Sequence, residues 1–150
     1  MFDRVDPRFK FNQKTTTYWV IFCKAPSIIK YFLKKDFGHV CVLTHDKYNW
    51  YIMDPAKTKW RINILAYTLE QDVPNILKNQ STAMLRVDLY ERDWARQNKY
   101  FGITTCVSNA MYAMGIKLWT FTPYGLYKKL LKLSHLPLKP CGIQSIKSVR

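Results

Sequence analysis

Apolar and polar residues follow one another along this chain in short segments that predict strands and helices. Five runs rich in β-branched and aromatic residues predict strands at residues 18–23, 38–44, 49–54, 60–65 and 84–89. Asp46 and Lys47 lie between the second and third runs and suit a tight two-residue turn. We therefore expect a hairpin, which the fourth run extends into an antiparallel meander.

Proline positions help to place two of the predicted helices. Pro26 suits the first turn of a short helix, and Pro74 interrupts a helical pattern over residues 68–79. The apolar face of the first of these helices is formed by Ile28, Ile29, Phe32 and Leu33.

Two further helices are predicted at residues 106–114 and 123–133. Thr104 or Thr105 can cap the first of them, and Gly115 can end it. Thr122 followed by Pro123 opens the second. Strands combined with helices in this way predict a mixed α+β domain.

Length and composition indicate one folded domain with two arms. The chain has 150 residues, of which 48% are hydrophobic and 15% aromatic, enough for one apolar core. Residues 1–17 are polar, and residues 134–150 contain Pro137, Pro140 and Gly142 without periodicity. We therefore expect an N-terminal arm at 1–17, a domain at 18–133 and a basic C-terminal tail at 134–150.

The hydropathy pattern also excludes some classes of protein. No apolar run approaches the ~20 residues of a membrane span, and the N-terminus lacks the apolar core of a signal peptide. The four cysteines are scattered along a chain without a secretion signal, which argues against a disulfide framework. We expect synthesis in the cytoplasm and reduced thiols.

Positive charge dominates the C-terminal third of the chain. The formal net charge is +14, and no acidic residue follows Asp93. The cluster Lys128, Lys129 and Lys132 predicts an anionic partner, namely DNA, an acidic virion surface or lipid headgroups. Two alternatives remain open: a solvated helix face, or docking of the leucines in residues 126–133 on a membrane or partner protein.

A candidate catalytic site emerges if Asp46 and Lys47 form the hairpin turn. The resulting register places His39 opposite Asp54, whose carboxylate would orient the imidazole. A slip of one residue would remove this pairing. Cys106 begins a predicted helix, where the macrodipole and unpaired amides favour a thiolate and the Cys106 amide could stabilise an oxyanion.

The same residues have simpler interpretations. Cysteine is often buried in a core, and a histidine at a strand end is often only hydrogen-bonded there. His39 and Cys41 are two residues apart and could both bind zinc, but the chain has no C-x-x-C pair. We therefore expect no metal.

Three motifs add a resemblance to this picture: Phe37-Gly-His39-Val-Cys-Val-Leu, then Trp50-Tyr-Ile-Met-Asp54-Pro, then Thr104-Thr-Cys106-Val-Ser-Asn-Ala-Met-Tyr-Ala-Met-Gly115-Ile. Their order resembles the circularly permuted NlpC/P60 branch of the papain-like cysteine peptidase fold. Residues 119–127 are also similar to small uncharacterised proteins of tailed phages and prophages. The resemblance spans residues 18–130.

This resemblance implies an α+β, papain-like fold whose antiparallel sheet packs against the cysteine-bearing helix, and a thiol mechanism at an amide, ester or thioester bond. Cys106 would be the nucleophile, His39 the general base and then acid, and Asp54 the residue that orients His39. Tyr51 or Asn49 would replace Asp54 if the register differed. No cofactor is implied.

The family context also implies where the protein acts. A phage hydrolase made in the host cytoplasm and built into the virion would cut peptidoglycan cross-bridges or transfer acyl groups. The alternative is a structural or ejected virion protein of the head, neck or tail, which keeps the fold and binds DNA or other virion proteins through its basic surface.

Overall fold

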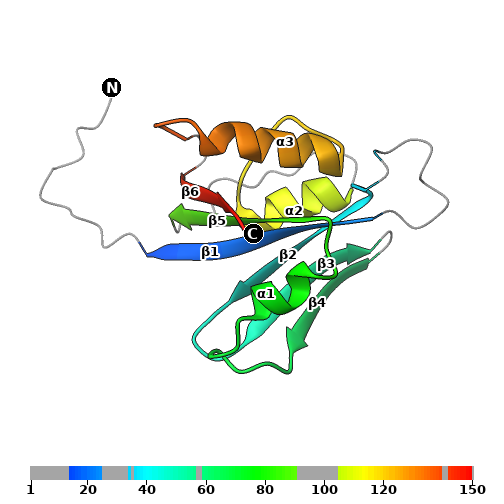
Figure 1. The fold of residues 1–150 in the computed structure, drawn as a ribbon, viewed down its shortest axis with the longest axis vertical. Coiled ribbons are helices and arrows are strands. Elements are labelled where there is room, and N and C mark those ends of the chain that lie inside the picture. The colour runs from blue at the N-terminus through cyan, green and yellow to red at the C-terminus, as the bar shows by residue number, and fades with distance from the viewer. Residues whose placement is uncertain are drawn as a thin grey trace, which may run out of the picture.

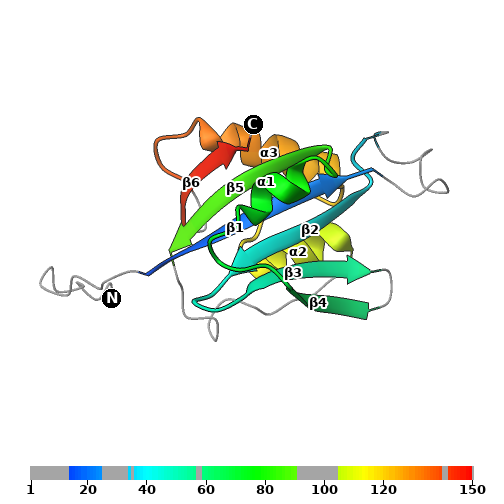
Figure 2. The same ribbon diagram turned by 60° about the horizontal axis from the view of Figure 1, so that its bottom comes forward.

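The computed structural model describes residues 14–24, 34, 36–56, 59–90, 105–139 and 142–149. Its strands are β1 (Thr15–Cys23), β2 (His39–His45), β3 (Trp50–Ala56), β4 (Lys59–Leu65), β5 (Ala83–Tyr90) and β6 (Ile143–Ser148). Its helices are α1 (Val73–Lys78), α2 (Cys106–Met114) and α3 (Pro123–Ser134). The strands form one sheet in the order β4-β3-β2-β1-β5-β6, and every neighbouring pair is antiparallel (Figures 1 and 2).

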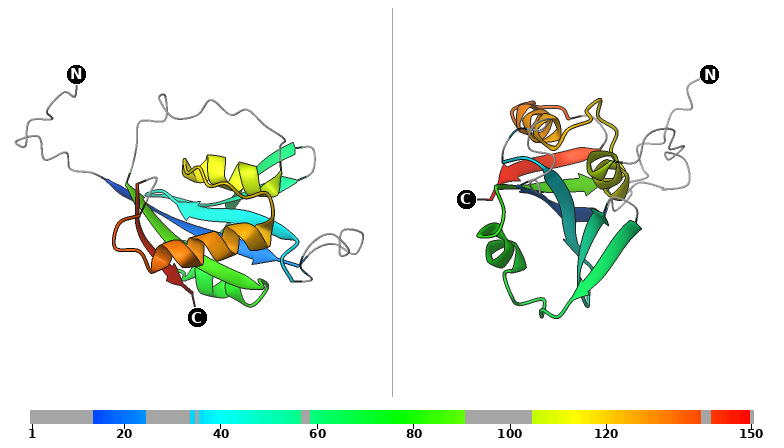
Figure 3. Two further views of the ribbon diagram at one scale, coloured as in Figure 1. Left: turned by 90° about the horizontal axis from the view of Figure 1, so that it is seen from above. Right: turned by 90° about the vertical axis from the view of Figure 1, so that its right-hand side faces the viewer.

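Helices cover both faces of the sheet. Helices α2 and α3 lie on one face, and the short α1 lies on the other (Figures 1 and 3). The larger core, beneath α2 and α3, includes the fully buried Phe22, Val42, Leu85, Val107, Leu126 and Leu130. The smaller core, on the α1 side, includes Trp19, Cys41, Leu43, Trp50 and Val73. No helix in the described part of the chain combines the length and apolar character needed to cross a bilayer.

The expected α+β, papain-like architecture is wrong, because strands make up more of this fold than the sequence pattern suggested. Within the described residues, six strands of six to nine residues accompany three helices of six, nine and twelve residues. Part of the excess comes from β6, which lies within the predicted tail, and part from β1, which begins at Thr15 within the predicted N-terminal arm. Residues 134–150 are therefore not simply a tail, since Ile143–Ser148 pairs with β5.

Of the four predicted helices, two are confirmed and one is shorter than predicted. The helices at 106–114 and 123–133 are confirmed, and their N-caps are Thr105 and Thr122. The helix predicted over 68–79 is only α1, because Asp72 caps it and Pro74 occupies its first turn instead of interrupting it. The helix predicted after Pro26 lies outside the described residues.

The predicted two-residue turn between β2 and β3 is also wrong. Residues 46–49 connect the strands, and the Asp46 carboxylate accepts hydrogen bonds from two backbone N–H groups of this turn at 2.6 and 2.7 Å. As a result Leu43 pairs with Ile52 instead of Trp50, a shift of two residues. Side chains on a strand alternate with a period of two, so the shift leaves each of them on its predicted face.

Candidate active site

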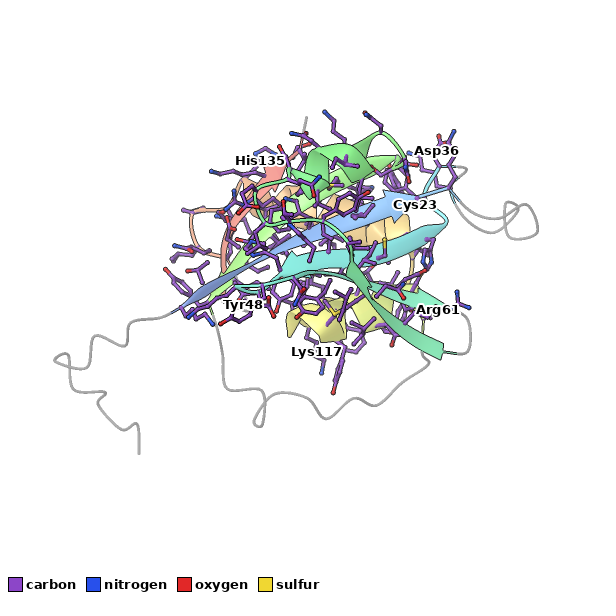
Figure 4. All side chains as sticks on the ribbon, turned by 90° about the horizontal axis from the view of Figure 1, so that it is seen from below. Cys23, Asp36, Tyr48, Arg61, Lys117 and His135 are labelled. Carbon is purple, nitrogen blue, oxygen red and sulfur yellow. The ribbon has the colours of Figure 1, made fainter. Side chains whose placement is uncertain are left out.

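The candidate site lies at the end of the sheet opposite the β2–β3 turn. Strand β1 ends at Cys23, β2 begins at His39, and Asp54 is close to the end of β3. Figure 4 shows Cys23 and Arg61 toward this end of the sheet and Tyr48, in the β2–β3 turn, toward the other. Helix α2, which packs against β2 and β3, begins at Cys106. Antiparallel pairing thus brings residues from distant parts of the chain to one end of the sheet.

His39 and Asp54 form the polar centre of this site. The observed register, continued by one pair, places Asp54 opposite Cys41 and so diagonally across from His39. Diagonal neighbours on one sheet face are within reach of long side chains. His39 Nε2 and Asp54 Oδ1 are 2.7 Å apart, and the two side chains are 30% and 39% exposed. The pair predicted from the sequence is therefore present, although in a different register.

The start of α2 is held by a reciprocal capping interaction. Thr105 Oγ1 accepts a hydrogen bond from the Ser108 backbone N–H at 3.1 Å, and Ser108 Oγ accepts one from the Thr105 N–H at 2.8 Å. This capping box fixes where the helix begins, with Cys106 as its first residue. The backbone N–H of Cys106, the first residue of α2, has no carbonyl partner within the helix and is available to stabilise an oxyanion.

The Cys106 side chain hydrogen-bonds to His39. This bond, followed by the hydrogen bond and charge of Asp54, raises the pKa of His39 to about 9, against the opposing effect of burial. Because Nε2 faces Asp54, Nδ1 is the ring nitrogen left for the thiol. His39 therefore holds a proton at neutral pH, flanked by a thiol on one side and a carboxylate on the other.

A second pair of thiols adjoins the site, and the sequence analysis did not identify it. Cys23 lies directly opposite His39 in the register of β1 and β2, and Ile21 lies opposite Cys41. The side chains of Cys23 and Cys41 hydrogen-bond to each other. The sequence gives no local sign of this pair, because Cys23 and Cys41 become neighbours only through the pairing of β1 with β2.

The lysine cluster lies on the outer side of α3. Lys128 and Lys132 are exposed, and Lys129 Nζ donates a hydrogen bond to the Trp119 carbonyl oxygen. Leu126 and Leu130 of the same helix are fully buried against the sheet, so they are not available for docking on a membrane or another protein. The exposed lysines thus lie on the face of α3 that points away from the core.

In the described part of the chain, no three His, Cys, Asp or Glu side chains are grouped so that they could hold a metal ion. His39 and Cys41, the pair considered for zinc, have other partners. His39 contacts Asp54 and Cys106, and Cys41 contacts Cys23.

Comparison with family models, with curated proteins and with solved structures gives no match for this chain. The resemblance to permuted NlpC/P60 enzymes therefore stays an expectation that rests on short motifs. A function must be inferred from the residues of this chain and their geometry.

Proposed function

We propose that this protein is a thiol hydrolase of the peptidase or amidase type, with Cys106 as the nucleophile. The supporting observation is the continuous chain of contacts from Cys106 to His39 to Asp54. A protonated imidazole beside a thiol favours the nucleophilic thiolate, and a carboxylate on the far side of the ring fixes its orientation. These are the groups needed to form and hydrolyse an acyl-thioester.

The raised pKa of His39 determines the order of proton transfers in this proposal. The Cys106 thiolate attacks the acyl carbon, and the Cys106 amide stabilises the oxyanion. The His39 imidazolium then gives its proton to the leaving group, which departs and leaves a thioester on Cys106. Neutral His39 takes a proton from water as it attacks the thioester, so the acid product leaves and the thiolate–imidazolium pair is restored. His39 thus acts first as an acid and then as a base.

The substrate follows from the resemblance and not from the geometry. Enzymes of the resembling family cut peptide bonds in peptidoglycan, so we propose a peptidoglycan cross-bridge as the first substrate to test. A phage-encoded protein carried in the virion would meet this substrate at the host cell wall.

Alkylation kinetics test the catalytic pair without a known substrate. In a His39→Ala variant we expect iodoacetamide to modify Cys106 at least about tenfold more slowly at pH 7, because the imidazolium that favours the nucleophilic thiolate is gone. Peptide mass mapping assigns the label to Cys106. The matched control is His135→Ala, which removes an exposed histidine at the end of α3 and should leave the rate unchanged. Equal rates in wild type and His39→Ala would disprove the pair.

A second candidate function is binding of single-stranded nucleic acid beside α3. Trp119 and Phe121, in the connection from α2 to α3, are 78% and 76% exposed. Lys128 and Lys132 are exposed on the adjoining helix, and no described residue after Asp88 is acidic. Exposed aromatic rings stack on bases while lysines pair with phosphates, a combination typical of single-strand binding.

The salt dependence of binding tests this surface. A plot of log affinity for a single-stranded DNA oligonucleotide against log salt should have a negative slope. Replacing Lys128 and Lys132 with glutamine should make this slope less steep by about 1.4. The matched control replaces Lys47 and Lys78, of the β2–β3 turn and α1, and should leave the slope unchanged. An unchanged slope in the α3 variant, or binding only to anionic lipid vesicles, would contradict the nucleic-acid proposal.

A further inference from the structure

Cys23 and Cys41 are a pair of contacting thiols for which the proposed hydrolysis has no use. They lie on neighbouring strands and on the same face of the sheet, since Cys23 pairs with His39 and Cys41 pairs with Ile21. Both are free thiols, and a hydrogen bond joins their side chains. Their separation along the chain is bridged by the β1–β2 pairing, so the sheet itself holds the two sulfurs together.

The two thiols differ in their surroundings. Cys41 is 7% exposed and packs with Trp19 and Ile21 in the smaller core, whereas Cys23 is half-buried at the end of its strand. The hydrogen bond from Cys41 lowers the pKa of Cys23, and the charge of His39 acts in the same direction. The hydrogen bond with Cys23 and burial raise the pKa of Cys41. Cys23 is thus the accessible nucleophile, and Cys41 is the buried thiol in contact with it.

This asymmetry is typical of dithiols that react by thiol–disulfide exchange. Such a pair needs one reactive, reachable sulfur and a second sulfur in contact with it. Cys106 does not fulfil the second role, because its side chain is hydrogen-bonded to His39.

We propose that Cys23 and Cys41 form a redox-active site that reduces low-molecular-weight disulfides. The Cys23 thiolate attacks one sulfur of the disulfide, which forms a mixed disulfide and releases one thiolate. Cys41 then attacks Cys23 Sγ, gives its proton to the medium and releases the second thiolate. The reagent gains two electrons and, with protons from solvent, becomes two thiols, while the protein gains a Cys23–Cys41 disulfide. This site does not depend on the proposed hydrolase.

Oxidised glutathione serves as the probe for the full-length protein. After incubation and alkylation of the remaining thiols, we expect peptide mapping to find Cys23 linked to Cys41 as the main product. The Cys41→Ala variant should instead accumulate a stable glutathione adduct on Cys23. In Cys23→Ser, modification of Cys41 should fall by at least about tenfold, because the buried thiol has lost its accessible partner.

Two controls separate this site from the other cysteines. Cys106→Ala and Cys141→Ser should both form the Cys23–Cys41 disulfide as wild type does, whether or not the protein hydrolyses any substrate. In unsubstituted protein, alkylation should modify Cys23 before Cys41. A persistent glutathione adduct on wild-type Cys23, a Cys23–Cys106 disulfide, or faster alkylation of Cys41 would each overturn the proposal.

Discussion

A Cys106→Ala variant is expected to lose at least about a thousandfold in the rate of acyl transfer from an activated ester such as p-nitrophenyl acetate, because it lacks the atom that forms the thioester. Wild-type protein should release a burst of p-nitrophenol equal to the enzyme concentration, followed by slower turnover. Mass spectrometry should find the acetyl group on Cys106. The variant should show neither the burst nor the adduct.

Controls must show which cysteine carries the acetyl group, because Cys23 is a second reactive thiol. Cys141→Ala removes a cysteine that the proposed mechanism does not use and should keep the burst. Cys23 lies opposite His39 and is the competing nucleophile. A burst that survives in Cys106→Ala but disappears in Cys23→Ser would assign the acyl group to Cys23 and contradict the proposed mechanism.

His39 and Asp54 illustrate why a site could be predicted from an incorrect register. The predicted turn contained two residues and the observed turn contains four, so every partner in the hairpin moved by two positions. An odd shift would have placed Asp54 on the opposite face of the sheet. The even shift only replaced a direct pair by a diagonal one, which the length of the two side chains can still bridge. The local alternation pattern was therefore sufficient for the site but not for the register.

Cys106 was predictable for a different reason, because caps and stops are local signals. Thr105 before the helix and Gly115 after it, with φ of 67°, fix both ends of α2 within a few residues of sequence. No local signal shows where a helix docks, so the contact with His39 required the structure.

The predicted fold class was wrong in part because β6 forms only by pairing with β5, which is distant in the sequence. Ile143 and Ile146 are buried, but they belong to a short segment that follows two prolines. Such a segment becomes a strand only when an edge is available, and β5 provides one. A strand that depends on pairing with another strand is difficult to predict from its own residues. The same limit applies to Cys23 and Cys41, which become a pair only because β1 adjoins β2.

The folding stability should depend on pH through His39. The pKa of His39 is about 9 in the folded protein, compared with 6.5 for an unperturbed histidine. Below pH 6.5 both the folded and the unfolded states hold the proton, and the contribution to stability is fully present. As the pH rises from 6.5 to 9 the unfolded state loses this proton first, so the contribution declines and is lost above the folded-state value. After allowance for partial exposure, we expect a loss of about 2 kcal/mol.

Urea unfolding of wild type and variants at pH 6, 7.5 and 9 measures this contribution. In His39→Gln, which keeps a polar side chain of similar length, the decline between pH 6 and 9 should be smaller by that amount, because thiols elsewhere titrate alike in both proteins. The Cys106→Ala variant should lose more of the His39-dependent decline than Asp54→Asn, since the hydrogen bond to Cys106 is the largest cause of the raised pKa of His39. Equal losses in wild type and His39→Gln over this range would show that folding adds no net proton to His39 and Cys106 together, and would contradict this prediction.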